Sequence, residues 1–468
     1  MRKPFKEQDV SLQITRLNTD GRGVGFFQKE GVPHLSKAEV LGALPGEEVI
    51  ATLGAKKRSL YQAKIKTLIT ASPDRVIPKC PHVPLCGGCS LQHLAYASQI
   101  KRKQEYIEGL FSSFNALLHP IIPCAAPFAY RNKMEFSFSQ NKEGEKFLGL
   151  ILAGSKGRVF NVKECYLPSS WFAKTLDDVR LWWEKSGLQA YYMHRDEGSL
   201  RTLILREGKR TGDKMVMLTV SGNPAFALSH EQVKQFVEVV RESVPSENLS
   251  IFLRIQQAIK GSPTQFYEMH LFGPDHIKEE LHLNVFSKAL KLTFKISPTS
   301  FFQPNTFQAE ILYSRALEML GLENIETIFD LYCGTATLGM AASSFVKKVI
   351  GIELNPHAVF DAEANKELNQ IENVEILQGD VGKVLKDLQI KPEAVIVDPP
   401  RSGLDALALS HLIALNPKKI LYISCNPATQ VENIKVLIEA GYCLKELQPV
   451  DQFPHTQHIE NIAVLTFT

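Results

Sequence analysis

The chain has 468 residues, of which 44% are hydrophobic and 22% charged, as is ordinary for a folded protein of two or three domains. Its net charge of +3 says little about partners. The start lacks the apolar stretch of a signal peptide, and no run of about 18 apolar residues occurs. These features exclude a helical membrane protein, and we expect a cytoplasmic one.

Residues 1–70 predict a small β-barrel. Short β-rich runs alternate with glycine-bearing turns at residues 12–15, 20–27, 47–52 and 62–66. The segment holds 12 Lys and Arg against 7 Asp and Glu, which suits a polyanion, although a solvated basic surface would look the same. Basic and aromatic groups that suit nucleic acid come from Lys56, Lys57, Arg58 and Tyr61.

Three cysteines crowd together after a proline-bearing linker at residues 72–78. Five residues separate Cys80 from Cys86, and two separate Cys86 from Cys89. In a chain expected to be cytoplasmic, such a group indicates metal binding before disulfides. With Cys165 it forms a Cys₄ set that suits a [4Fe-4S] cluster or zinc. The distant, solitary fourth cysteine favours the cluster, but spacing alone does not choose between them.

Residues 71–290 predict a β-rich central domain. A helix is expected over residues 96–114, where it can pack on the last domain, and another over 169–185. Strand pairs are expected between residues 133–139 and 147–152, between 201–206 and 215–220, and between 251–256 and 266–271. The expected architecture is an antiparallel or mixed sheet with a few helices.

Residues 291–468 alternate strand and helix. A helix is expected over residues 306–320, and strands over 326–331, 349–353, 374–377 and 395–398. This alternation predicts an α/β domain with a parallel, doubly wound, Rossmann-like sheet. The whole chain therefore reads as a barrel, a β-rich middle and an α/β domain.

A glycine-bearing turn follows the first strand of this domain, from Asp330 to Gly339. It matches neither a dinucleotide loop nor a P-loop. Glu353 ends the next strand, 19 residues after Gly334, where a carboxylate can hold both ribose hydroxyls of a nucleoside. S-adenosylmethionine, which has a ribose but no phosphates, fits this pattern best.

Reactive side chains follow two later strands. Residues 394–397 lead into Asp398, two prolines and Arg401, and residues 421–424 lead into Cys425. Asn426 and Pro427 are typical of a helix start, so we expect an exposed Cys425 with a lowered thiol pKa. Glu460 precedes a last apolar strand at residues 462–467. Ligand groups of open α/β sheets collect at such strand ends.

Together these features resemble the RNA uracil-C5 methyltransferases that carry an iron–sulfur cluster and a TRAM domain. The resemblance runs almost end to end. It rests on the barrel, the cysteine set and the motifs Phe302-Gln-Pro-Asn305, Asp330-Leu-Tyr-Cys-Gly-Thr335, Asp398-Pro-Pro-Arg401, Ser424-Cys-Asn-Pro427 and His458-Ile-Glu460. The combination is specific, although its single pieces are not.

The resemblance implies S-adenosylmethionine-dependent formation of 5-methyluridine in RNA, with Cys425 as nucleophile and Glu460 as base. It also implies cofactor contacts from Gln303, Tyr332, Glu353 and Asp398, of which Asp398 can double as an orienter of the uracil. For Arg401 a structural salt bridge is as good an interpretation as a contact to the enolate oxygen or a phosphate. The target uridine is expected to flip out of its stack.

Several alternatives stay open. A radical S-adenosylmethionine enzyme also joins such a barrel to a cluster, but it uses a CxxxCxxC spacing that is absent here. A non-catalytic RNA-binding protein would leave Cys425, Asp398 and Glu460 as a coincidence. We expect 23S rRNA as the substrate, with the T-loop uridine of tRNA as the alternative, and a monomer.

Overall fold

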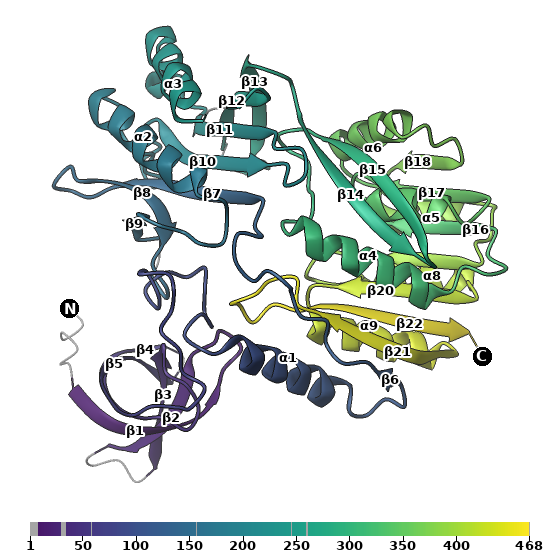
Figure 1. Ribbon diagram of the computed structural model, residues 1–468, viewed down its shortest axis with the longest axis horizontal. Helices are drawn as coiled ribbons and strands as arrows, with labels where there is room; N and C mark the ends of the chain where they lie inside the picture. Colours follow the sequence, from purple (N-terminus) through teal and green to yellow (C-terminus); the bar gives the residue numbers. More distant parts are fainter. Residues whose placement is uncertain are drawn as a thin grey trace.

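The computed structural model describes residues 8–29, 34–57, 59–155, 157–244, 246–258 and 261–467, and it begins with the predicted barrel (Figure 1). Five strands close this barrel in the order β1-β2-β3-β5-β4. They are β1 (Gln8–Leu17), β2 (Gly23–Gln28), β3 (Leu35–Leu41), β4 (Glu48–Lys57) and β5 (Leu60–Thr70). Closure leaves no free sheet edge among the five described strands of the barrel.

Tyr61 does not offer its ring to a ligand, contrary to the sequence-based expectation. The residue is 3% exposed, and its ring lies edge-on to Phe27 with 5.4 Å between centroids. Lys29 Nζ donates to the Tyr61 hydroxyl at 3.0 Å, and Lys56 Nζ lies 4.7 Å from the ring centroid. Tyr61 therefore packs the barrel interior. Arg58 of the basic run lies outside the described residues.

The central region is a seven-stranded mixed sheet in the order β13-β12-β11-β10-β7-β8-β9. Its strands are β7 (Lys133–Gln140), β8 (Lys146–Ile151), β9 (Val159–Asn161), β10 (Leu200–Glu207), β11 (Lys214–Ser221), β12 (Leu249–Gln257) and β13 (Gln265–Phe272). All three predicted antiparallel pairs are present, and β11 runs parallel to β12. One face packs on α2 (Trp171–Lys185) and α3 (His230–Ser243), and a short helix η1 (Pro224–Phe226) precedes α3.

A long hairpin links the central sheet to the last region. It pairs β14 (Ile277–Val285) with β15 (Lys288–Ile296) in a sheet of their own. Its apolar side chains belong to the same core as those of the last region, and Figure 1 shows it lying across α4 and the sheet beyond. The boundary predicted after residue 290 lies inside β15.

The last region is an eight-stranded sheet in the order β18-β17-β16-β19-β20-β22-β21-β6. The first five strands of this order are parallel, as predicted, and β22 runs antiparallel to both of its neighbours. The strands are β6 (Leu117–Leu118), β16 (Thr327–Leu331), β17 (Lys348–Glu353), β18 (Val374–Gln378), β19 (Ala394–Val397), β20 (Lys419–Ser424), β21 (Tyr442–Val450) and β22 (Glu460–Phe467). Strand order reverses between β16 and β19, which is where open α/β sheets bind ligands.

Helices cover both faces of this sheet, so it is doubly wound. One core includes α4 (Thr306–Leu320), α5 (Thr337–Ser343) and α6 (Pro356–Leu368). The other includes α7 (Val381–Asp387), α8 (Ala406–Leu415) and α9 (Pro427–Glu439). Strand residues alternate between the two cores, as the pleat requires. No helix in the described part of the chain is long and apolar enough to cross a membrane.

Helix α1 (Tyr96–Phe111) packs on this last region although it lies far upstream in sequence. Ile107 and Phe111 join the core that contains α9, and Figure 1 shows α1 running beside α9. Lys103, also on α1, forms an ion pair with Asp451, with 2.6 Å between Nζ and Oδ1. Both side chains are at most 1% exposed, so the pair is shielded from solvent. The predicted packing of this helix on the last region is therefore present.

Replacing Lys103 with Met is expected to lower the free energy of unfolding by about 3–5 kcal/mol, because Asp451 would remain buried without its partner. Urea denaturation measures the change. The double variant K103M/D451N, which removes both charges, should regain most of the loss. Lys101→Met, on the exposed face of the same helix, is the control. A single variant as stable as the native protein would contradict the expectation.

Candidate active site

Three predicted cofactor residues lie side by side at the carboxyl edge of the sheet. Leu331 is paired with Ile352 on one side and with Val397 on the other. The next residue along each strand is therefore Tyr332, Glu353 or Asp398. The pairing places these three at neighbouring strand ends, at the point where strand order reverses. The strand pairing thus brings together three of the residues for which the sequence predicts a cofactor contact.

Two carboxylates hold the loop after β16 and the start of α5 through backbone N–H groups. Glu353 accepts hydrogen bonds from Gly334 N at 2.9 Å and from Asn355 N at 2.7 Å. Tyr332 has a left-handed backbone, with φ of 62°. Gly339 N donates to Asp330 Oδ2 at 2.9 Å, and a Cβ on Gly339 would lie 2.7 Å from that oxygen. A side chain there would have to displace the Asp330 carboxylate, so the start of α5 lies close against the strand end.

Gln303 and Tyr313 approach this edge from α4 and the segment before it. Gln303 is buried, and its Oε1 accepts from Gln452 Nε2 at 3.3 Å. Tyr313 is also buried and shares a side-chain hydrogen bond with Gln303. Burial and the nearby Asp398 raise the pKa of Tyr313. Tyr313 was not predicted as a site residue. The available signal was its place on α4, about two helical turns after the Phe302-Gln-Pro-Asn305 motif.

Cys425 and Glu460 face each other across an antiparallel strand pair. Ser424 on β20 is paired with Asn461 on β22, so Cys425 and Glu460 are the next residues outward. Side chains at directly opposed positions lie on the same face of such a pair. Glu460 is buried, at 3% exposed, and Cys425 is half-buried. The sheet therefore brings the predicted nucleophile and base together.

Helix α9 begins after Cys425, but Asn426 caps it differently from the prediction. Pro427 occupies the first turn, as expected. Asn426 makes no side-chain cap; its Nδ2 instead donates to Arg401 O at 3.0 Å. Ser424 Oγ accepts from Asn426 N at 3.1 Å. These bonds tie the turn after β20 to the loop after β19.

The pKa of Cys425 is raised, which corrects the expectation of a lowered value. Burial is the main cause, followed by the charges of Glu460 and Asp398, and together they raise the pKa of the thiol to about 11. The Arg401 guanidinium acts in the opposite direction but more weakly. Burial likewise raises the pKa of both Asp398 and Glu460. Burial and the two carboxyls therefore outweigh the Arg401 charge, which acts to lower the pKa of this thiol.

Alkylation of Cys425 is therefore expected to speed up with pH until about pH 11, because only the thiolate reacts. In the variant Glu460→Gln one negative charge is gone, so the pKa of Cys425 falls and the profile moves to lower pH. Mass spectrometry of iodoacetamide-labelled peptides measures both rates. Cys443, which is paired with Thr466 near the other end of β22, is the internal reference. An unchanged profile in the variant would contradict this account.

Two histidines shortly before Glu460 have different surroundings. His455 is buried, and burial lowers its pKa to about 4, so it stays neutral and packs against Phe128 with 4.4 Å between ring centroids. His458 is exposed, and its Nδ1 lies 3.4 Å from an Arg401 nitrogen. His458 and Arg401 thus lie together at the mouth of the site, whereas His455 is a structural residue.

The four predicted metal ligands converge. Cys80, Cys86, Cys89 and Cys165 line one small cavity beneath the central sheet. Burial raises the pKa of Cys89, as do the three other thiols beside it. Among the described residues, no set of three or more His, Cys, Asp or Glu side chains has an arrangement that could hold a metal ion. The four thiols therefore lie around one cavity, but the described residues do not have the geometry of a metal-binding centre.

The fold and the residues at the carboxyl edge of the eight-stranded sheet together define a class of enzyme. A doubly wound sheet with a glycine-bearing loop after its first strand and a carboxylate at the end of its second is the architecture of S-adenosylmethionine-dependent methyltransferases. The comparisons with known proteins agree. The model of the family described as tRNA (Uracil-5-)-methyltransferase matches residues 268–467.

Curated relatives match nearly the whole chain. An uncharacterized RNA methyltransferase of Protochlamydia amoebophila is 50% identical over 440 residues, which are 92% of this chain and 99% of the relative. Another from Clostridium tetani is 34% identical over 465 residues, 98% of each chain. The chain belongs to the RNA uracil-5-methyltransferase family, and S-adenosylmethionine is its methyl donor.

One solved structure matches over its full length. The crystal structure of Pyrococcus abyssi tRNA (uracil-54, C5)-methyltransferase in complex with S-adenosyl-L-homocysteine aligns with a TM-score of 0.73 at 25% identity. The alignment covers 98% of this chain and 100% of that one. The likeness therefore extends beyond the catalytic region to the barrel and the central sheet.

Proposed function

We propose that this enzyme forms 5-methyluridine in RNA through a covalent adduct between Cys425 and C6 of the uracil. The observation that carries the proposal is the register of β20 and β22, which sets a thiol opposite a buried carboxylate. Asp398, at the end of the adjacent β19, is close enough to raise the pKa of both groups. A thiol and two carboxyls around one edge suit addition followed by proton removal.

The chemistry requires each of these residues in turn. Uracil C5 is too electron-poor to take a methyl group directly. Addition of the Cys425 thiolate to C6 breaks the C5=C6 double bond and leaves C5 as a nucleophilic enolate carbon. S-adenosylmethionine supplies an electrophilic methyl group when bound. Once C5 carries the methyl group, Glu460 removes the C5 proton, the C5=C6 bond re-forms and the thiolate leaves.

The cofactor is proposed to lie along the edge formed by Tyr332, Glu353 and Asp398, with Gln303 facing it from the start of α4. Glu353 would hold the ribose hydroxyls. In this structure its two carboxylate oxygens accept hydrogen bonds from Gly334 N and Asn355 N. Asp398 reaches both this edge and Cys425, so we propose that it also orients the uracil. Arg401, beside His458, would face the enolate oxygen or a phosphate.

RNA is proposed to enter through the cleft between the barrel and the central sheet. Arg22 and Gln62 of the barrel, Arg131, and His458 at the mouth of the site all line it. A cleft that carries Arg22 and Arg131 and is lined by His458 near the site suits a strand whose target base has flipped out. We propose that the barrel is a TRAM-like RNA-binding domain, and that the protein works as a cytoplasmic monomer.

The RNA is proposed to be 23S rRNA, as the combination of barrel and cysteine set suggests. The tRNA T-loop uridine is the second candidate, favoured by the full-length likeness to the P. abyssi enzyme. Nucleoside mass spectrometry for 5-methyluridine decides between the two substrates. It is carried out on rRNA and tRNA purified separately from cells with and without the gene. Loss from rRNA alone supports the proposal, loss from tRNA moves the substrate, and loss from neither contradicts the mechanism.

The cysteine cavity is proposed to hold a [4Fe-4S] cluster, bound by the four thiolates that line it. Methyl transfer needs no electron transfer, so the role proposed for the cluster is to organise the RNA-contacting backbone around it. A radical S-adenosylmethionine reaction would instead need one open iron, and four cysteines leave none.

Replacing Cys86 with Ser is expected to remove the cluster's visible absorbance and bound iron and to weaken RNA binding or folding. Iron analysis, absorbance spectra and RNA filter binding measure these effects. Cys443→Ser, on β21, is the control. Normal stability and RNA affinity in the Cys86 variant would contradict the structural role. Zinc in place of iron would change the metal but not the site.

A further inference from the structure

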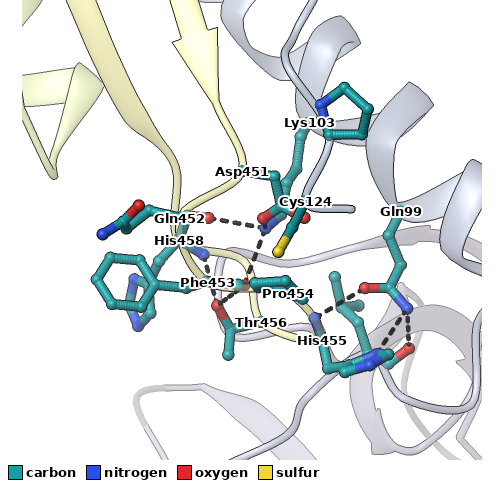
Figure 2. A network of polar contacts seen from close by, with 12 residues as sticks. Gln99, Lys103, Cys124, Asp451, Gln452, Phe453, Pro454, His455, Thr456 and His458 are labelled. Carbon is teal, nitrogen blue, oxygen red and sulfur yellow. Dashed lines mark hydrogen bonds and ion pairs between the residues drawn. The ribbon is translucent and has the colours of Figure 1, made fainter. Parts of the chain in front are cut away.

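The loop between β21 and β22 ends at the catalytic base, yet much of its support comes from α1. Val450 pairs with Glu460, so the loop runs from Asp451 to Ile459. Gln99 and Lys103 lie one helical turn apart on α1, and both point into this loop (Figure 2). A helix that is remote in sequence therefore holds the segment that presents Glu460.

Lys103 holds the loop at three points. Its Nζ donates to Asp451 Oδ1 at 2.6 Å, to His458 O at 2.8 Å and to Phe453 O at 3.2 Å (Figure 2). An ammonium has three donors, so all of its capacity is used on this loop. Two of the bonds reach backbone carbonyls, one of them only two residues before Glu460. Lys103 thus fixes the path of the chain, and not only the charge of Asp451.

Gln99 ties the same loop to the segment after the cysteines. Gln99 Oε1 accepts from His455 N at 3.0 Å, and its Nε2 lies 3.2 Å from His455 Nδ1. The same Nε2 donates to Leu94 O at 2.8 Å and to Leu91 O at 3.1 Å. Leu91 N in turn donates to His455 O at 3.0 Å. The loop and the segment beyond Cys89 therefore share one hydrogen-bond network.

His455 is held in a strained backbone conformation by this network. Its φ is 66°, in the left-handed region that non-glycine residues rarely adopt. Its N–H and its carbonyl are both engaged, by Gln99 and by Leu91. Such strain persists where surrounding bonds over-determine a conformation, and it is concentrated at functional sites.

The far side of the loop reaches the proposed cofactor contact. Gln452 Nε2 donates to Gln303 Oε1 at 3.3 Å, and Asn305 Nδ2 donates to Gln452 O at 3.1 Å. The loop is thus fixed between α1 on one side and Gln303 on the other. A displacement of the loop would move the chain that leads into Glu460.

We propose that Lys103 and Gln99 are positioning residues for proton removal by Glu460, and that Gln99 links this step to the backbone at Leu91 and Leu94, just after Cys89. The inference rests on the proposed function. Neither residue touches the reacting atoms; each acts by holding the carbonyls and N–H groups of the loop. Loss of this hold leaves Cys425 able to add to uracil but leaves Glu460 out of line for the C5 proton.

The test is whether a loop variant accumulates the methylated adduct. The double variant K103M/D451N leaves no lone buried charge, so its stability recovers while the carbonyls of Phe453 and His458 lose their donor. We expect kcat to fall roughly 10- to 100-fold with KM values for RNA and cofactor within about twofold. A protein–RNA adduct should build up on denaturing gels, as in the reference variant Glu460→Gln.

Each outcome decides. The inference is wrong if the double variant is stable but slow and forms no adduct, or if it has full kcat. In either case an adduct in Glu460→Gln still supports the proposed function. Absence of adduct in Glu460→Gln overturns both. If the double variant does not fold, Gln99→Met, which frees His455 but leaves the ion pair intact, must accumulate the adduct or the inference is wrong. Lys101→Met, exposed on the same helix, must behave as the native protein.

Discussion

Replacing Cys425 with Ala is expected to lower methylation by at least about 10⁴-fold, because the proposed mechanism activates C5 by adding the Cys425 thiolate to C6. Cofactor binding should persist, since the Tyr332, Glu353 and Asp398 edge is intact. The measurements are 5-methyluridine formation by mass spectrometry, and cofactor affinity by calorimetry on the same sample. Retained affinity with lost turnover separates a chemical role from a folding defect.

Two other cysteines bear on this result, Cys443 as a control and Cys333 as the alternative nucleophile. Cys443→Ala, on β21, should leave activity unchanged. Cys333 lies in the cofactor loop, close to Gly351, and burial raises the pKa of its thiol well above the ordinary value. We expect Cys333 to pack and not to react. Near-normal methylation by Cys425→Ala would show that another thiol, Cys333 first, is the nucleophile.

The edge of the α/β sheet was predictable because strand ends leave a clear signal. Apolar runs followed at once by Glu353, Asp398 or Cys425 place reactive groups where parallel strands end, and the strand pairing confirms that placement. The barrel and the three antiparallel pairs were predictable for a similar reason, since alternating runs between glycine turns depend on local sequence alone.

Features that depend on distant contacts were not predictable. The pKa of the Cys425 thiol is raised first by burial and then by Glu460, which comes from an antiparallel strand 35 positions later, so the direction of the shift depends on the assembled sheet. Tyr61 looked like a surface aromatic but fills the barrel. Lys103 belongs to a Lys-Arg-Lys run on α1, and only the fold shows that its side chain is buried and paired with Asp451. Each depends on which chain segments meet.

Replacing Glu460 with Gln is expected to lower turnover by roughly 10²–10⁴-fold and to leave the protein covalently joined to RNA. Addition by Cys425 and methylation of C5 precede the step that needs a base, so both still occur. Without a base the C5 proton stays, the C5=C6 bond cannot re-form and the thiolate cannot leave. Denaturing gels with labelled RNA, and mass spectrometry of the Cys425 peptide, detect the methylated adduct.

The adduct identifies the step as well as the residue. Glu439→Gln, an exposed carboxamide substitution at the end of α9, should turn over normally and trap nothing. The double variant C425A/E460Q should also trap nothing, because the adduct needs the thiol. Slow turnover by Glu460→Gln without an adduct would place Glu460 before C–S bond formation, for example in accepting the thiol proton. The raised pKa of both groups makes that distinction measurable, since a base for the thiol would shift the pH profile of adduct formation.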